Sequence, residues 1–340
     1  SIILREIQDD PSAPLHTTLD IQVQQAIENT LVGHSGSIGI VAIDAEDGAI
    51  LGAASRPLGG YNRAFEGRYS PGSTFKTVTA EALIAGGFSS SDSVECPAQT
   101  TVGGLQVTNA GGRSLGATDL FTAFVESCNT TFASLATQLD DGALNEAAER
   151  FGFNHEHDLG LPHFGGSFPD SADTAELGAS AFGQARVEAS VVHMASVAAA
   201  AVQGTWYAPY LIQDDRPEEA RPLTAGASDE LRSMMRGVVT GGTGRQAAVD
   251  GVDVFGKTGT AEASGGIEHA WFIGYVDGIG FAILVEEGGS GGAVAAPIAN
   301  RFVQELTATR RDGTTDAPDV DDDNPADNPE DADANTDPDQ

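Results

Sequence analysis

Two residues in the first quarter of the chain have the types and spacing that serine chemistry requires. Ser73 follows Pro71 and Gly72, which end any preceding element, and helix-compatible residues continue to about residue 83. This pattern places Ser73 at or just inside a helix N-terminus and Lys76 on the same helix face. A lysine can take the proton of a serine hydroxyl if burial and a cationic neighbour lower its pKa. The alternative interpretation is a helix start followed by a solvated lysine.

Two later stretches strengthen the catalytic interpretation. Ser127-Cys128-Asn129 comes 54 residues after Ser73, and Lys257-Thr258-Gly259-Thr260 lies much later, among residues with a strand-like pattern. Ser-x-x-Lys, Ser-x-Asn and Lys-Thr-Gly in this order form the signature of penicillin-binding proteins and serine β-lactamases. Each motif alone is common, whereas the ordered set is specific.

On these motifs the chain resembles the transpeptidase domain of class B penicillin-binding proteins, and it looks most like the actinobacterial elongation-type enzymes. The resemblance covers roughly residues 15 to 306. It includes four further stretches, Thr17-Thr18-Leu19-Asp20, Asn62-Arg63-Ala64, Ala261-Glu262 after the Lys-Thr-Gly motif, and His269-Ala270-Trp271-Phe272-Ile273-Gly274-Tyr275. Gln184-Ala185-Arg186 departs from the pattern, because many members have a Gly-Gln-Gly run there.

The resemblance implies a peptidoglycan D,D-transpeptidase that cross-links stem peptides and is covalently inhibited by β-lactams. Ser73 would form an acyl-enzyme with the penultimate D-alanine, and Lys76 would be its base. Ser127 would relay the proton to the departing D-alanine, and Asn129 would hold Lys76 and the substrate amide. No metal-ligand cluster appears among the seven histidines of the sequence, so we expect no metal, and we expect no cofactor.

The third motif would bind the substrate along a strand edge. A carboxylate would find a cation and hydroxyl donors there, supplied by Lys257, Thr258 and Thr260. Gly259, between the two threonines, is the fourth residue expected to bind the substrate. Backbone N–H groups of Ser73 and Thr260 would form the oxyanion hole. The stem peptide would add to the sheet edge through main-chain hydrogen bonds.

The resemblance also implies where such a protein works and with what. Its ligands would be stem peptides ending in D-Ala-D-Ala, and a glycosyltransferase of the SEDS type would be its membrane partner. Family members carry an N-terminal membrane anchor and a non-catalytic module, so we expect the extracytoplasmic face of the cell membrane, with the anchor absent from this chain. The longest apolar run, residues 189–202, is interrupted by His193 and is too short to span a bilayer.

Three alternatives differ in their chemistry. A β-lactamase or a D,D-carboxypeptidase would hydrolyse the acyl-enzyme, which requires a base for water, and we find no convincing carboxylate for that task. A β-lactam sensor domain would be acylated without turnover. Nucleotide binding is suggested by residues 251–258, which fit the Gly-x-x-x-x-Gly-Lys-Thr pattern. That pattern requires a helix after the threonine, however, and Gly259 with Thr260 is poor helix material.

Composition excludes other classes of function. The 340 residues include 50 acidic and 17 basic ones, giving a formal net charge of −33, and residues 312–340 alone hold twelve acidic residues and no basic one. This charge argues against binding of nucleic acid, which needs Lys and Arg to displace counterions. It also argues against docking on anionic lipid through this domain.

Cys96 and Cys128 are the only cysteines. Two cysteines in a chain of this length do not make a disulfide framework. We therefore expect both to be free, with Cys128 a small buried residue between two candidate site residues.

The elements that must position the motifs are predicted from periodicity. Two early strands (37–43 and 49–54) and three late ones (252–257, 270–276 and 281–286) favour one antiparallel five-stranded sheet built from both ends of the chain. Helices are expected at 19–31, 73–83, 118–139 with a break at Ser127, 144–151, 191–202, 229–239 and 297–306. The fold class is therefore α/β (α+β), with the sheet flanked by helices and a mostly helical lobe. The resemblance implies the same penicillin-binding protein/serine β-lactamase-like fold.

Three regions follow from this pattern. Residues 1–14 are interpreted as the remnant of a linker or pedestal, 15–307 as the penicillin-binding transpeptidase domain, and 308–340 as an acidic tail. The tail is rich in Asp, Pro and Asn with almost no apolar residue, so we expect it to be disordered.

Overall fold

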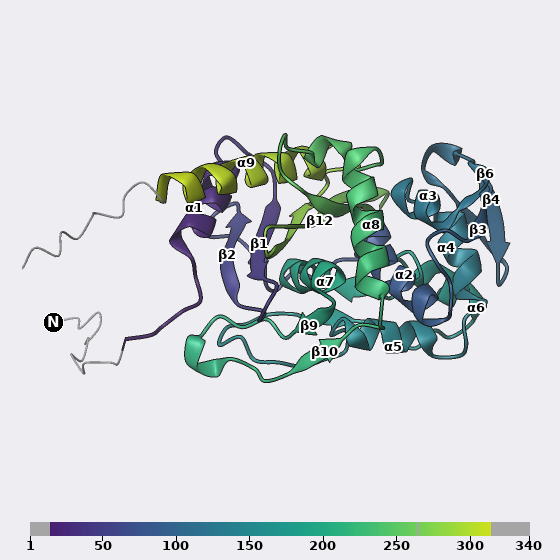
Figure 1. The fold of residues 1–340 in the computed structure, drawn as a ribbon, viewed down its shortest axis with the longest axis horizontal. Coiled ribbons are helices and arrows are strands. Elements are labelled where there is room, and N and C mark those ends of the chain that lie inside the picture. The colour runs from purple at the N-terminus through teal and green to yellow at the C-terminus, as the bar shows by residue number, and fades with distance from the viewer. Residues whose placement is uncertain (1–13, 264, 314–340) are drawn as a thin grey trace, which may run out of the picture.

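The structure of the chain is a computed structural model, and it describes residues 14–263 and 265–313 (Figure 1). The predictions for residues 1–13 and 314–340 lie outside the described residues. The boundary between the domain and the predicted tail lies later in the chain than expected. The closing helix, expected to end at residue 306, continues as α9 (Ala295–Gly313).

The predicted five-stranded antiparallel sheet is confirmed. Its order is β11-β12-β13-β1-β2, so the first two strands of the chain lie beside the last three. The strands are β1 (Ile38–Asp44), β2 (Ile50–Arg56), β11 (Phe255–Ala263), β12 (Ile267–Val276) and β13 (Ile279–Val285). Strand β11 begins three residues later than predicted and lies at one edge of the sheet.

Alternation along the strands gives the sheet two buried faces. On β13, Phe281 and Ile283 pack in a cluster with α1 (Ile21–Thr30) and α9, which lie side by side in Figure 1. Ala282 and Leu284 point the other way, into a larger cluster around α7 (Val191–Gln203). Since both faces are covered by helices, the sheet is a rigid base for whatever its edge presents.

The predicted helical lobe is confirmed beyond the β11 edge. Its helices are α2 (Lys76–Ala85), α3 (Leu120–Val125), α4 (Asn129–Ala136), α5 (Ala143–Arg150) and α6 (Thr174–Ser180). Helix α8 (Ala227–Thr240) lies alongside them. The predicted break at Ser127 is the junction between α3 and α4. The resulting arrangement places three distant segments, the starts of α2 and α4 and the strand β11, against one another.

Short strands in the lobe were not predicted. Residues 86–115 contain β3 (Ser93–Cys96), β4 (Gln99–Val102) and β5 (Leu105–Thr108), with β6 (Gly116–Asp119) just after them. Farther on come β7 (Gly166–Ser167), β8 (Glu188–Ala189), β9 (Thr205–Tyr207) and β10 (Ala220–Pro222). They pair only two by two, and segments of two to four residues are too short to show a period.

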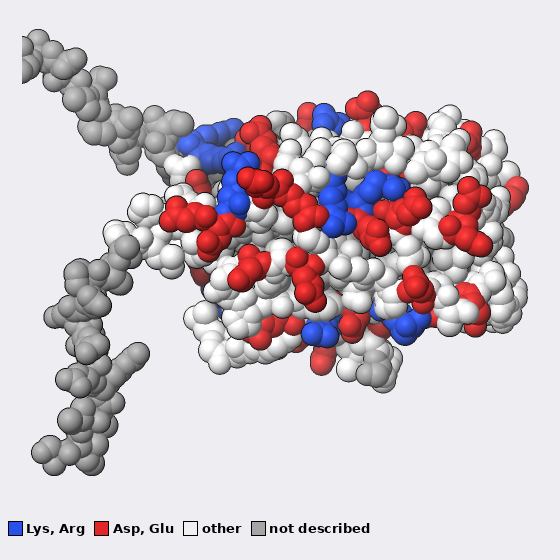
Figure 2. All heavy atoms as spheres, turned by 90° about the horizontal axis from the view of Figure 1, so that it is seen from below, with Lys and Arg blue, Asp and Glu red and all other residues white. Residues whose placement is uncertain are grey.

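The surface is acidic, as the composition requires. Figure 2 shows acidic side chains spread over the face seen there, with the basic ones in a few small groups between them. In the described part of the chain, no helix combines the length and the hydrophobicity needed to cross a bilayer.

His193 on α7 is a buried polar residue. Neither of its ring nitrogens makes a hydrogen bond to any described residue, and the ring packs edge-on against Phe153 at 4.4 Å. Burial, with a smaller contribution from His157 and His155, lowers the pKa of His193 to about 3. The folded protein therefore holds this imidazole neutral.

Acidification should consequently destabilise the fold through His193. Its folded pKa lies below the ordinary 6.5, so its contribution is complete above that value and is lost as the pH falls from there toward 3. At about pH 5 the loss is on the order of 2 kcal/mol of unfolding free energy. His193→Leu should show a correspondingly weaker pH dependence in urea unfolding between about pH 7.5 and pH 5. Equal pH dependence of the two proteins would contradict this account.

Candidate active site

Ser73 lies in a single 3-10 turn, η1 (Gly72–Phe75), that leads directly into α2. Gly72 has φ +53°, and a Cβ there would lie 2.6 Å from the carbonyl oxygen of Thr260, so the turn packs against strand β11 as only glycine allows. Behind the turn, the Phe75 ring is buried and stacks on Phe168. The Ser73 side chain remains partly exposed between these supports.

Lys76 is completely buried, and its amine contacts polar atoms of Ser73, Ser127 and Asn129. Nζ lies 3.0 Å from Ser73 Oγ, 2.8 Å from the Ser127 carbonyl oxygen, 3.1 Å from Ser127 Oγ and 2.6 Å from Asn129 Oδ1. Burial, and then the charge of Lys257, lower its pKa well below the ordinary value. The amine is therefore available as a base.

The partners of Lys76 also orient its lone pair. The carbonyl oxygens of Ser127 and Asn129 can only accept, so they take two N–H groups of a neutral amine. The Asn129 amide cannot be reversed, because its Nδ2 donates to the Thr108 carbonyl oxygen at 3.0 Å. The remaining direction of the amine faces the hydroxyls, where Ser73 can donate its proton to the nitrogen.

Ser127 connects the two lysines. Its Oγ accepts a hydrogen bond from Lys257 at 2.9 Å and lies 3.1 Å from Lys76 Nζ, which donates its third N–H to this oxygen once the amine is protonated. With both lone pairs directed at amines, the hydroxyl proton is free to point elsewhere. Ser127 itself has φ +60°, a left-handed conformation that is uncommon for a residue with a Cβ. The sharp turn between α3 and α4 is what places the hydroxyl between the two amines.

Lys257, on the edge strand β11, is the second buried amine. It donates to Ser127 Oγ and, at 3.1 Å, to the Thr258 carbonyl oxygen, and burial lowers its pKa to about 7. These two are the only lysines of the chain; the other fifteen basic residues are arginines. Among the described residues, neither lysine forms a salt bridge. Instead, Lys76 lies over the ring of Phe132 and Lys257 over that of Phe124.

The rest of the third motif lines the edge of the sheet. Thr258 Oγ1 lies 2.6 Å from Thr243 Oγ1, and Thr260 Oγ1 accepts from the backbone N–H of Gly291 at 3.3 Å. Gly259 carries no side chain where the Ser73 turn approaches: a Cβ there would lie 3.0 Å from the Pro71 carbonyl oxygen. Strand edge and turn are therefore in direct contact.

All eight residues singled out from the sequence thus lie in one place: Ser73, Lys76, Ser127, Asn129, Lys257, Thr258, Gly259 and Thr260. Sequence reasoning missed Thr243 and the Thr108 carbonyl. Thr243 stands in an unremarkable Gly-rich turn after α8, and a backbone carbonyl has no signature in a sequence at all.

The prediction that both cysteines are free is wrong. Cys96, at the end of β3, and Cys128, between the two polar residues of the second motif, form a disulfide with a Cα–Cα distance of 6.2 Å. The pairing was missed because 32 residues separate them and the intervening strands were not recognised. A pair of cysteines is informative about pairing only once the chain's path is known.

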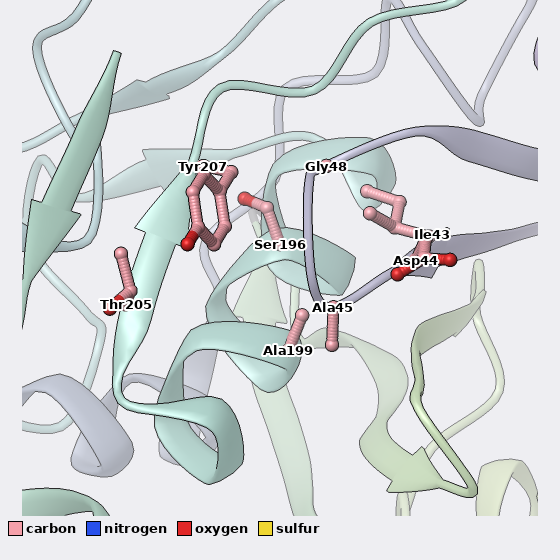
Figure 3. Close-up of a pocket in the computed structure, with 8 residues that line it drawn as sticks. All are labelled: Ile43, Asp44, Ala45, Gly48, Ser196, Ala199, Thr205 and Tyr207. Atoms are coloured by element: carbon pink, nitrogen blue, oxygen red, sulfur yellow. The ribbon is translucent and has the colours of Figure 1, made fainter. Parts of the chain in front are cut away.

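Two further features do not contribute to this site. The first is the phosphate-loop pattern, whose Gly-Lys-Thr lies inside strand β11 with no helix directly after it. The second is a narrow hollow between the β1–β2 turn, α7 and β9, which is lined by Asp44, Ser196, Thr205 and Tyr207, among others (Figure 3). It shares no residue with the three motifs, and its one carboxylate, on Asp44, accepts a hydrogen bond from the backbone of Glu46.

Comparison with known proteins agrees with this geometry. A family model described as the penicillin binding protein transpeptidase domain matches residues 38–304. The chain is 29% identical over 275 residues to "Peptidoglycan D,D-transpeptidase PbpA" of Mycobacterium tuberculosis, an alignment that covers 72% of this chain and 56% of that protein. The chain therefore spans a little over half the length of this curated relative.

Two solved structures have the same fold. One is penicillin-binding protein A of M. tuberculosis in an imipenem acyl-enzyme complex, with a TM-score of 0.79, 26% identity and coverage of 86% of this chain and 79% of that one. The other is the D,D-transpeptidase domain of a peptidoglycan glycosyltransferase from Eggerthella lenta, with a TM-score of 0.77, 27% identity and coverage of 87% and 83%.

The two lysines can be observed directly. Protein labelled with ¹³C at lysine Cε should give two resonances, and both should titrate below the ordinary lysine pKa of 10.5. Lys257→Met removes the neighbouring charge but keeps an unbranched buried chain, so the remaining Lys76 resonance should titrate at higher pH. Arg301→Met on α9, a distant exposed cation, is the control and should leave both titrations unchanged. An unshifted Lys76 titration in Lys257→Met would refute the coupling.

Proposed function

Because this chain belongs to the penicillin-binding protein transpeptidase family, as its three motifs predicted, we propose that it is a peptidoglycan D,D-transpeptidase. One observation carries the proposal: the buried amine of Lys76 contacts both Ser73 Oγ, at 3.0 Å, and Ser127 Oγ, at 3.1 Å. A base, a nucleophile and a proton relay are thereby in contact before any substrate binds.

Acylation uses these contacts in order. Ser73 Oγ passes its proton to the neutral Lys76 amine and attacks the carbonyl carbon of the penultimate D-alanine of a stem peptide. The bond to the terminal D-alanine breaks, and its nitrogen needs a proton. Lys76, now protonated, supplies it through Ser127 Oγ, whose own proton goes to the leaving amine. The positive charge of Lys257 disfavours a second positive charge nearby, so Lys76 stays protonated only briefly.

Strand β11 binds the substrate. Thr258 and Thr260 donate to the terminal carboxylate, and Lys257 supplies positive charge beside them. The backbone N–H groups of Ser73 and Thr260 hold the developing oxyanion, where one such donor is worth about 3 kcal/mol of barrier. The contact between the Gly72 turn and Thr260 supports this pairing. As an edge strand, β11 can add the stem peptide as a further strand.

The second half-reaction transfers the acyl group to the amine of another stem peptide. A β-lactam acylates Ser73 in the same way, but its leaving nitrogen stays attached to the adduct. The chain's relative in an imipenem acyl-enzyme complex supports this reading. Hydrolysis of the acyl-enzyme would need a further base, such as a carboxylate, to activate water. Among the described residues neither lysine has a carboxylate partner, and the Ser73 hydroxyl hydrogen-bonds only to Lys76 and Asn129. Hydrolysis is therefore disfavoured.

The location follows from the substrate. We place the protein at the cell membrane, on its extracytoplasmic face, with a SEDS-type glycosyltransferase as its membrane partner. The Cys96–Cys128 disulfide supports that side of the membrane, because disulfides persist in oxidising compartments.

Ser73→Ala should abolish labelling by fluorescent penicillin, because it removes the proposed nucleophile, and Ser127, the other serine in contact with Lys76, serves as the proton relay. The melting temperature should change little, since Ser73 is partly exposed. Ser70→Ala, in the same loop, is the matched control and should label normally. Persistent labelling of Ser73→Ala would show that another residue is the nucleophile.

The lifetime of the penicilloyl adduct separates transfer from hydrolysis. Mass spectrometry of the intact chain after penicillin treatment should show one adduct that persists for hours. An adduct that disappears in seconds would assign the protein to the β-lactamases. A long-lived adduct combined with no cross-linking of stem peptides by the full-length protein would indicate a β-lactam sensor.

A further inference from the structure

We propose that the Cys96–Cys128 disulfide positions Ser127 and Asn129 for the reaction, making the two cysteines positioning residues of the site. This inference rests on the proposed function, because it assigns the disulfide a role in that same acyl transfer. It does not involve either sulfur in the chemistry.

The turn that carries Ser127 has little support of its own. Ser127 adopts the left-handed conformation between two short helices, of six and eight residues. Its N–H bonds back to Phe124, and that of Cys128 to Ala123, so both ties reach toward α3. Cys128 is the N-cap residue of α4 and offers no capping hydrogen bond from its side chain. Another constraint must therefore set where α4 begins.

That constraint comes from strand β3. The disulfide joins Cys128 to the last residue of β3, and both cysteines are buried. Around it, Thr131 Oγ1 donates to the Glu95 carbonyl oxygen and Thr130 Oγ1 to that of Pro97, each at 2.8 Å. The first turn of α4 is thus fastened to one end of β3 by one covalent bond and two hydrogen bonds.

Asn109 completes the junction. Its buried amide accepts from the backbone N–H of Thr130 at 3.1 Å and donates to the carbonyl oxygens of Pro97 and Arg113. The preceding residue, Thr108, supplies the carbonyl that orients Asn129. The segment that surrounds the disulfide therefore also sets the direction of a group that contacts Lys76.

Breaking the disulfide should move the site residues. Two thiols move apart beyond bonding distance, and two alanines are not joined at all. In both cases we expect Cys128 to shift relative to β3, and Ser127 and Asn129 on either side to shift with it. Both contact the Lys76 amine at 3.1 Å or less. Because misplacement by about 1 Å can cost about 100-fold in rate, we expect acylation to slow by about tenfold or more.

The test compares the oxidised chain with Cys96→Ala/Cys128→Ala. The second-order rate constant for acylation by benzylpenicillin should fall about tenfold, and the Lys76 ¹³Cε resonance should shift more than that of Lys257. Leu306→Ala, in the core under α9 on the other face of the sheet, controls for lost stability and should leave the rate constant within about twofold. A folded double variant that is acylated as fast as the oxidised chain would overturn the proposal.

Should the double variant fail to fold, the oxidised chain can be reduced instead. A trialkylphosphine converts the disulfide and one water into two thiols and the phosphine oxide, and alkylation followed by mass spectrometry counts the thiols. Slow acylation after reduction, restored by reoxidation, supports the proposal; an unchanged rate with two thiols present overturns it. If the oxidised chain is not acylated at all, the proposed function fails, while the Lys76 resonance still reports whether the disulfide positions the turn.

Discussion

The site depends on two amines buried beside one hydroxyl, with no neutralising carboxylate in the part of the chain that the structure describes. Lys76 and Lys257 both contact Ser127 Oγ, at 3.1 and 2.9 Å, so their nitrogens lie within about 6 Å of each other. Burying one unpaired ammonium costs several kcal/mol, and two close together cost more. The protein avoids this by favouring the neutral amine at Lys76, which is the form that a base requires. The structure around them supplies carbonyl acceptors and aromatic rings in place of anions.

The architecture brings these buried groups together from three distant segments of the chain. Lys76 starts a helix of the lobe, Ser127 lies between two other helices, and Lys257 is on the edge strand of a sheet whose neighbours come from both ends of the chain. None of the three segments can form the site by local folding. A sheet packed on both faces keeps β11 in place, and close contacts at Gly72 and Gly259 set the spacing between strand and turn.

Sequence reasoning succeeded where a signal is local or periodic. The five strands, the helical lobe and the break at Ser127 follow from hydrophobic periodicity, and motif order singled out eight candidate residues that the structure brings together. It failed where the signal lies only in the chain's path. The disulfide could not be recognised because β3 and its neighbours are too short to show a pattern. Thr243 and the carbonyl of Thr108 belong to the site through contacts alone, and neither residue type is distinctive.

The acidity of the chain poses a last question, because a negative field favours the protonated form of any amine. With a net charge of −33, a field of this sign acts against the low pKa values in the site. Those surface charges are solvated, however, and at physiological ionic strength salt screens them over about 8 Å. Burial and the second amine act at contact distance and are screened far less, so the local terms dominate. A chain can therefore become strongly acidic outside while the chemistry of its two lysines, both fully buried, stays governed by their immediate surroundings.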